Sequence, residues 1–96
     1  MTLEGIRLNA INLERQGREA EEDWHALSAE ILRLVQCAQA YRDGAWDKRK
    51  PMRLAVVAPW CTRLWEIRRD AIHGCMLPEI TRVAALLAIY LQSEAI

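Results

Sequence analysis

The stretch LEGIRLNAINLERQGREAEEDWHALSAEILRLVQCAQAY, from Leu3 to Tyr41, decides the fold. Apolar or small residues recur in it at steps of three and four, and the positions between them are mostly polar. The series is Leu3, Ile6, Ala10, Leu13, Gly17, Ala20, Trp24, Leu27, Ile31, Leu34, Ala38 and Tyr41. That spacing is typical of a helix that buries one narrow seam against other helices. It predicts a long helix, clearest from Leu13 onward, that stops near Gly44.

Two further helices are expected after a loop over residues 43–51. The second helix follows Pro51 and ends at Gly74, with Pro59 inside it as a kink or as a restart at Ala58. Its seam is Leu54, Val57, Cys61, Leu64, Ala71 and Cys75, with Trp65 and Ile72 beside it. The third runs from Pro78 to about Ser93. Its apolar stripe is Ile80, Val83, Ala84, Leu87, Tyr90 and Leu91. The fold class is therefore all-α, a long helical hairpin plus a C-terminal helix, in one domain over residues 1–96.

The composition excludes several classes of protein. With 13 basic and 13 acidic residues the net charge is zero, so no overall field draws the chain to nucleic acid. No apolar run approaches the roughly 18 residues of a membrane span, and no signal peptide is visible. Three cysteines without a C-x-x-C pair fit reduced thiols in a cytoplasmic protein.

Two carboxylate–histidine pairs have the spacing of di-metal helix bundles, Glu22 with His25 and Asp70 with His73. The heptad phase points all four side chains away from the seam, whereas bundle ligands point inward. We therefore expect no metal and no cofactor, and read these residues as polar surface.

Glu19-x-x-Glu22 and Glu66-x-x-x-Asp70 resemble the acidic pairs with which all-α nucleotide pyrophosphohydrolases hold magnesium. The second pair of that family is spaced E-x-x-D, one residue shorter than here. A metal-dependent enzyme of that kind is one alternative function, and we expect instead that the protein is not an enzyme. The basic loop Lys48-Arg49-Lys50 with Arg53 supports another alternative, a DNA-binding regulator, although nearby acids argue against a nucleic-acid contact.

Four tryptophans in a chain without phenylalanine are an excess that favours protein binding. Trp24 and Trp65 belong with the seams and are expected in the core, whereas Trp46 lies in the loop and Trp60 off the seam. The third helix is apolar nearly all round. The candidate protein-binding residues are therefore Trp46, Trp60, Leu87, Tyr90 and Leu91.

A homodimer is expected from the length of the first helix. A helix from Leu13 to Arg42 would be roughly 45 Å long, whereas a compact globule of this size is only about 33 Å across. The helix would overhang its own domain while its apolar seam continued to both ends. A second copy packing on the first and third helices would cover that seam.

The expected function is a protein-binding regulatory module. A short helical chain, rich in Trp and Arg, with a long helix to Tyr41, a loop and a second long helix to Cys75, resembles the small bacterial quorum-sensing anti-activators of the QslA and TraM type. That resemblance implies a chain that sequesters a transcriptional regulator, in this family one of the LuxR type, by protein–protein contact.

Overall fold

A computed structural model describes residues 2–44, 52–75 and 77–96. Within those ranges there are four helices, α1 (Leu3–Glu19), α2 (Glu22–Gly44), α3 (Leu54–His73) and α4 (Pro78–Glu94). They contain no strand beyond an isolated bridge between Met52 and Ala95. The all-α class is confirmed, but the expected three-helix layout is wrong, because the long first helix is two helices.

The break falls at Ala20 and Glu21. Ala20 has a non-helical backbone, φ −116° and ψ −149°, and the chain turns back so that α2 packs on α1. Four of the five residues from Glu19 to Asp23 are acidic, and like charges three or four residues apart destabilise a continuous helix. At the start of α2, by contrast, Glu22 and Asp23 face the positive end of the helix dipole.

Gly17 allows the close approach of the two helices. A Cβ added there would lie 2.6 Å from the Cα of His25 and 2.7 Å from the Oγ of Ser28. Any larger residue would push the backbone of α2 away. The glycine that continued the apolar series is thus a contact point between α1 and α2.

The other helix boundaries follow from local chemistry. Thr2 caps α1, its Oγ1 accepting a hydrogen bond from the Gly5 N–H at 3.1 Å. Pro78 starts α4 in the first turn, where its missing N–H is not needed. Of the two alternatives at Pro59, a kink or a restart at Ala58, the restart is not seen, since α3 continues through Pro59.

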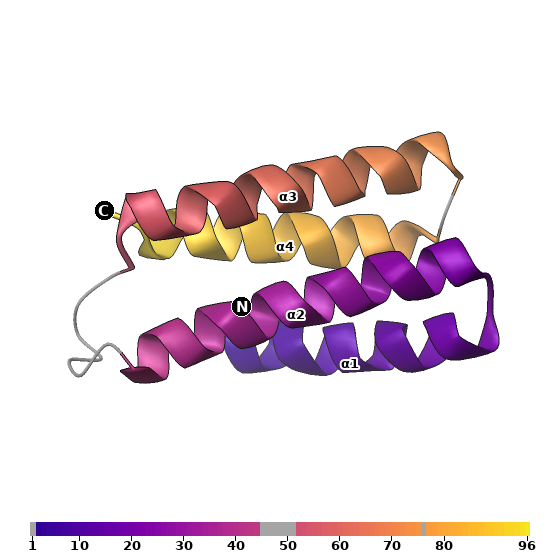
Figure 1. Ribbon diagram of the computed structural model, residues 1–96, viewed down its shortest axis with the longest axis horizontal. Helices are drawn as coiled ribbons and strands as arrows, with labels where there is room; N and C mark the ends of the chain where they lie inside the picture. The colour runs from indigo at the N-terminus through magenta and orange to yellow at the C-terminus, as the bar shows by residue number, and fades with distance from the viewer. Residues whose placement is uncertain (1, 45–51, 76) are drawn as a thin grey trace.

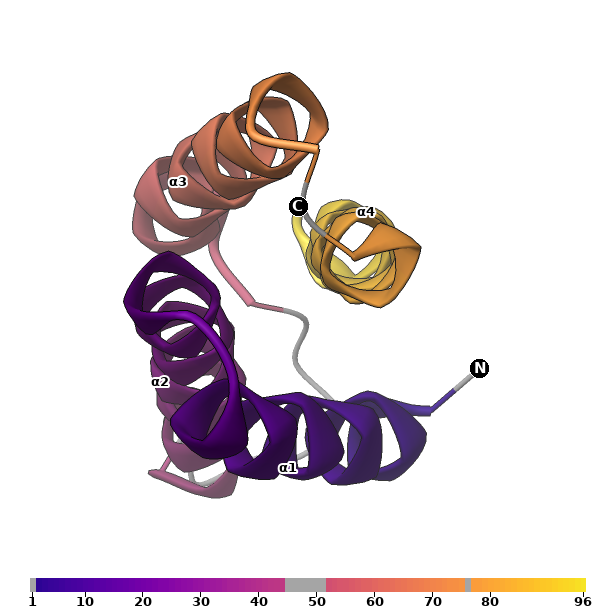
Figure 2. The same ribbon diagram turned by 90° about the vertical axis from the view of Figure 1, so that its right-hand side faces the viewer.

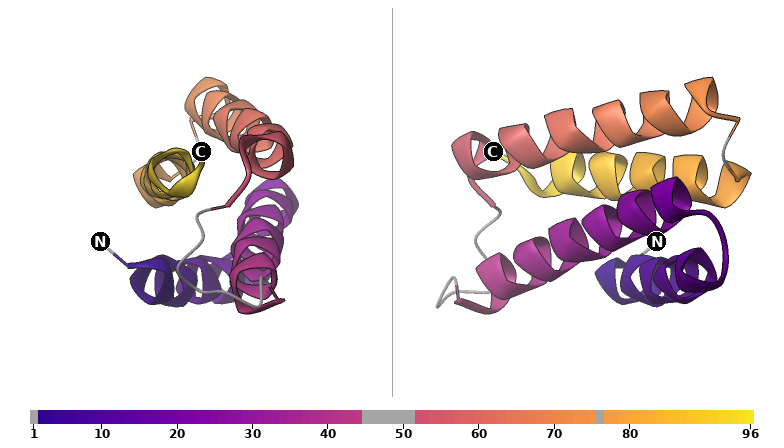
Figure 3. Two further views of the ribbon diagram at one scale, coloured as in Figure 1. Left: turned by 90° about the vertical axis from the view of Figure 1, so that its left-hand side faces the viewer. Right: turned by 45° about the vertical axis from the view of Figure 1, so that its right-hand side comes forward.

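The helices form two hairpins, α1–α2 and α3–α4, which pack together into a molecule of 40 × 22 × 19 Å (Figure 1). Viewed from one end, α1 crosses away from α2 and α4 lies between α1 and α3 (Figure 2). Two further views show α3 and α4 side by side along their length (Figure 3).

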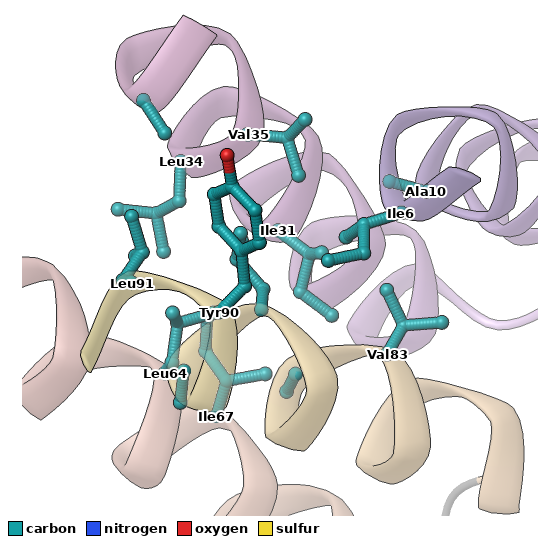
Figure 4. Close-up of a cluster of buried hydrophobic side chains, with 14 of the residues drawn as sticks. Ile6, Ala10, Ile31, Leu34, Val35, Leu64, Ile67, Val83, Tyr90 and Leu91 are labelled. Atoms are coloured by element: carbon teal, nitrogen blue, oxygen red, sulfur yellow. The ribbon is translucent and has the colours of Figure 1, made fainter. Parts of the chain in front are cut away.

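Buried residues from all four helices make one core. The whole predicted stripe of α4 is buried, and so are Ile31, Leu34, Leu64 and Ala71, which the seams placed together, while Leu27 is partly buried against them. Tyr90 reaches from α4 toward α2, its ring beside Leu34 and Val35 (Figure 4).

Candidate protein-binding surface

The α3–α4 hairpin carries most of the exposed large apolar side chains. In the described ranges seven such residues are exposed, and six of them belong to residues 54–96. They are Leu54, Trp65, Ile72, Leu77, Ile89 and Ile96; the seventh, Leu8, is alone on α1. The α1–α2 hairpin therefore has no comparable surface.

Helix geometry aligns three of these six residues, and the register of the hairpin sets the level of a fourth. Trp65 and Ile72 follow Leu54 by about three and five turns of 3.6 residues, so all three lie on one line along α3. The contact between Cys61 Sγ and the Ala88 carbonyl oxygen, at 4.0 Å, sets the register of α3 against α4 and places Ile89 at the level of Cys61. We call Leu54, Trp65, Ile72 and Ile89 the outer apolar face; each is 39–57% exposed.

Backbone hydrogen bonds at the open end of the hairpin confirm this register. The Leu54 N–H donates to the Ile96 carbonyl oxygen at 3.0 Å, and the Ile96 N–H donates to that of Met52 at 3.1 Å. Residue numbers that face each other across the hairpin therefore sum to about 149. By the same rule Ile72 and Leu77 are level at the turn.

Arginines accompany the outer apolar face. The guanidinium carbon of Arg68 lies 5.1 Å from the centre of the Trp65 ring, a cation–π contact. Arg69 and Arg82 are exposed, and the Nε of Arg69 makes a long 3.8 Å contact to the carboxylate of Asp70. The face is therefore apolar at its centre and basic at its border.

The two hairpins are joined by an ion pair at Glu30. Its Oε1 accepts a hydrogen bond from Arg33 on α2 at 2.7 Å and lies 3.5 Å from Nε of Arg63 on α3. The hydrogen bond from Arg33 lowers the pKa of the Glu30 carboxyl below its ordinary value, against the opposing effect of partial burial. Glu30 is the charged link between α2 and α3.

The five predicted protein-binding residues differ in how far they are buried and in whether the structure describes them. Leu87, Tyr90 and Leu91 are buried in the chain's own core, so a second protein could reach them only if α4 moved. Trp60 is partly buried and packs edge-on against Tyr41, with ring centres 6.2 Å apart. Trp46 lies outside the described residues. A binding role for these five residues stays a prediction.

Sequence reasoning missed the outer apolar face. Leu54 was assigned to a seam and Trp65 to the core, yet both are exposed. The sequence did contain a signal for this face, the position of each residue around its helix. Trp65 and Ile72 lie beside the seam of α3, and Ile89 lies off the stripe of α4.

The acidic constellations do not converge. Glu19 ends α1 and Glu22 begins α2, so this pair spans the link between two helices instead of one helical turn. Glu66 lies within 3.4 Å of Arg63. Among the described residues, no three His, Cys, Asp or Glu side chains are placed to hold a metal ion.

Most of the basic loop, Lys48 to Lys50, lies outside the described residues, and Arg53 is exposed just before α3. No helix within the described ranges is both long enough and apolar enough to cross a membrane.

The three cysteines have different surroundings. Cys61 is buried, and that burial raises the pKa of its thiol. Cys37 is partly buried on α2. Cys75, expected in a seam, is exposed just after α3 with a left-handed backbone, φ 53°. It lines a cleft of about 340 Å³ where the α1–α2 link meets the α3–α4 turn, together with Glu21, Trp24 and Leu77.

Comparisons with known proteins add no relative: no family model, no curated protein and no solved structure matches this chain. The resemblance to the quorum-sensing anti-activators stays a prediction. Its layout needs one correction, because the single helix expected to reach Tyr41 is α1 followed by α2.

Proposed function

We propose that this chain is a protein-binding module whose partner docks on the outer apolar face. The observation that carries the proposal is the uneven distribution of exposed apolar side chains, six of seven within the α3–α4 hairpin. Single exposed apolar residues are ordinary, whereas several on one face, bordered by polar groups, are typical of association surfaces.

The residue types also support this proposal. Tryptophan and arginine are enriched among the residues that contribute most to protein–protein affinity. Here Trp65 is 39% exposed and Arg68 lies over its ring. Within the class of protein-binding modules, sequestration of a transcriptional regulator of the LuxR type is what the resemblance implies, and it stays a prediction.

A homodimer is expected from the length of a single first helix, and this reason does not apply to the folded chain. A helix of 45 Å that overhangs its own domain does not exist, since α2 has 23 residues and α1 folds back on it. The outer apolar face is the surface that a second copy could cover. Two copies meeting there would bring Arg68, Arg69 and Arg82 of each close together, so we propose that the partner is a different protein.

Crosslinking in an extract of the native host, followed by mass spectrometry, tests the proposed function. Ile72→Ser should remove the crosslinked partner, because it replaces an exposed apolar side chain of the line with a hydroxyl. Leu8→Ser is the matched control, since Leu8 and Ile72 are 51% and 55% exposed on different hairpins. A partner that is lost with Leu8→Ser and kept with Ile72→Ser would place the binding surface on α1.

A further inference from the structure

At the helix positions that share a face with the two central residues of the outer apolar face, the charges are all of one sign. Positions three, four and seven residues from Trp65 and from Ile89 share their helix faces. Those positions hold Arg68, Arg69 and Arg82 but no aspartate or glutamate. A partner that covers this face therefore meets positive charge in the neighbourhood of both central residues.

The register brings the three arginines to one level of the hairpin. Facing residue numbers sum to about 149, as the contacts of Cys61 with Ala88 and of Leu54 with Ile96 establish. Arg82 is then level with the residue just before Arg68. All three arginines therefore lie at about one level of the hairpin, between the levels of Trp65 and Ile72.

Among the described residues, no carboxylate forms an ion pair with Arg68. Its Nε is buried, and no acceptor among the described residues takes a hydrogen bond from it. The Trp65 ring holds the guanidinium in place instead. A guanidinium fixed in this way is prepared to bind a carboxylate through two parallel hydrogen bonds, which is the geometry that arginine favours.

We propose that the occupant of the outer apolar face is an amphipathic helix of another protein with carboxylates along the border of its apolar side. This inference rests on the proposed function and adds the chemistry of the partner. An amphipathic helix packs its apolar residues, at steps of three and four, against an apolar surface of its partner. From Leu54 to Ile72 the apolar line is about 27 Å long, the length of a helix of roughly 18 residues.

Two synthetic 18-residue helical peptides are the probes for this proposal. Both carry leucines at the same steps of three and four; one has glutamates beside the leucines and the other has lysines. Fluorescence anisotropy of the labelled peptides measures their binding to the full chain. At about 50 mM salt we expect the glutamate peptide to bind roughly tenfold more tightly, since three weak exposed ion pairs act together. That advantage should shrink in about 300 mM salt because exposed charges are then screened.

Variants of the chain separate the contribution of the arginine charges to peptide binding from the contribution of the apolar contact. Arg68→Gln combined with Arg82→Gln should bring the affinities of the two peptides to within about threefold of each other. The reason is that the preference for the glutamate peptide comes from these side chains. Ile72→Ser should weaken both peptides. Arg15→Gln and Leu8→Ser, which change an exposed arginine and an exposed leucine on α1, should leave both affinities unchanged.

Equal binding of the two peptides would overturn the acidic partner and leave the proposed function standing. If neither peptide bound, or if binding were insensitive to Ile72→Ser, the helical occupant would be excluded. The extract experiment, which uses no peptide, would still report on the proposed function in both cases. Light scattering that showed a dimer dissociated by Ile72→Ser would assign the face to a second copy instead.

Discussion

Replacing Gly17 by alanine should destabilise the protein, although the same change in most helices is stabilising. In a helix interior, alanine is favoured over glycine by about 0.5–1 kcal/mol. At Gly17 the new Cβ would lie 2.6 Å from the Cα of His25, whereas ordinary contacts begin at 3.4 Å. The neighbour is backbone of α2, so relief of the overlap of about 0.8 Å requires the two helices to separate. Overpacking of this kind costs about 1–3 kcal/mol. We expect a net loss of about 1–2 kcal/mol.

Urea denaturation followed by helical circular dichroism measures this loss as a lower midpoint with an unchanged slope. Gly5→Ala is the control within the same helix. The nearest atom to a Cβ at Gly5 is the Oγ1 of Thr2 at 3.4 Å, an ordinary contact, so this variant should be as stable as the parent or more stable. If Gly17→Ala stabilised the protein as Gly5→Ala does, the close packing of α1 on α2 would be refuted and a single continuous helix would be the better description.

Three further predictions concern the core, a pH effect and the thiols. Ile31→Ala, at a fully buried site, should lower the free energy of unfolding by about 2–5 kcal/mol, whereas Ile72→Ala should change it by less than about 0.5 kcal/mol; similar losses in urea melts would contradict the burial pattern. The pKa of Glu30 is lowered on folding, so its ion pairs stabilise the protein above the ordinary carboxyl value of 4.5, and that stability disappears as the pH falls through the lower folded value. Glu30→Gln should therefore cost about 0.5–1 kcal/mol at neutral pH and nothing near pH 2, and an equal cost at both would exclude the ion pair as its source. Iodoacetamide should label Cys75 quickly and Cys61 slowly, because Cys61 is buried and burial raises the pKa of its thiol; mass spectrometry of the native protein would show the reverse order if these positions were misplaced.

The periodicity of the sequence predicts the helices because buried positions recur along them. Every member of the predicted α4 stripe is buried, and the helix begins and ends within a residue of the expected bounds. The α1–α2 break was missed because the apolar series does not change phase across it. Leu13 and Ile31 continue the same steps of three and four, yet they lie on different helices. Gly17 and the acidic run after it were the signals for a boundary.

The candidate surface was harder to predict than the fold. Period alone cannot separate a residue that packs inside its own chain from one that awaits a partner, because both are apolar and both recur on a helix face. Leu87 and Leu91 were chosen for their hydrophobicity, and the packing of α4 against α2 and α3 buries them. Trp65 and Ile72 lie at the edge of α3, where exposure depends on how far α4 covers it. How far α4 covers α3 is decided by the packing of the two helices, so the spacing of apolar residues in the sequence does not predict it.

The hydrogen bonds between the residues that flank α3 and α4 also bear on local motion. Helix ends generally fray, so the amides near them exchange with solvent quickly. Here the amides of Leu54 and Ile96 each donate to a carbonyl oxygen on the opposite segment. Fraying of α4 therefore requires the start of α3 to open with it, and the two segments behave as one cooperative unit. Their amide exchange rates should rise and fall together, so the open end of the hairpin would already be ordered for the partner that we propose.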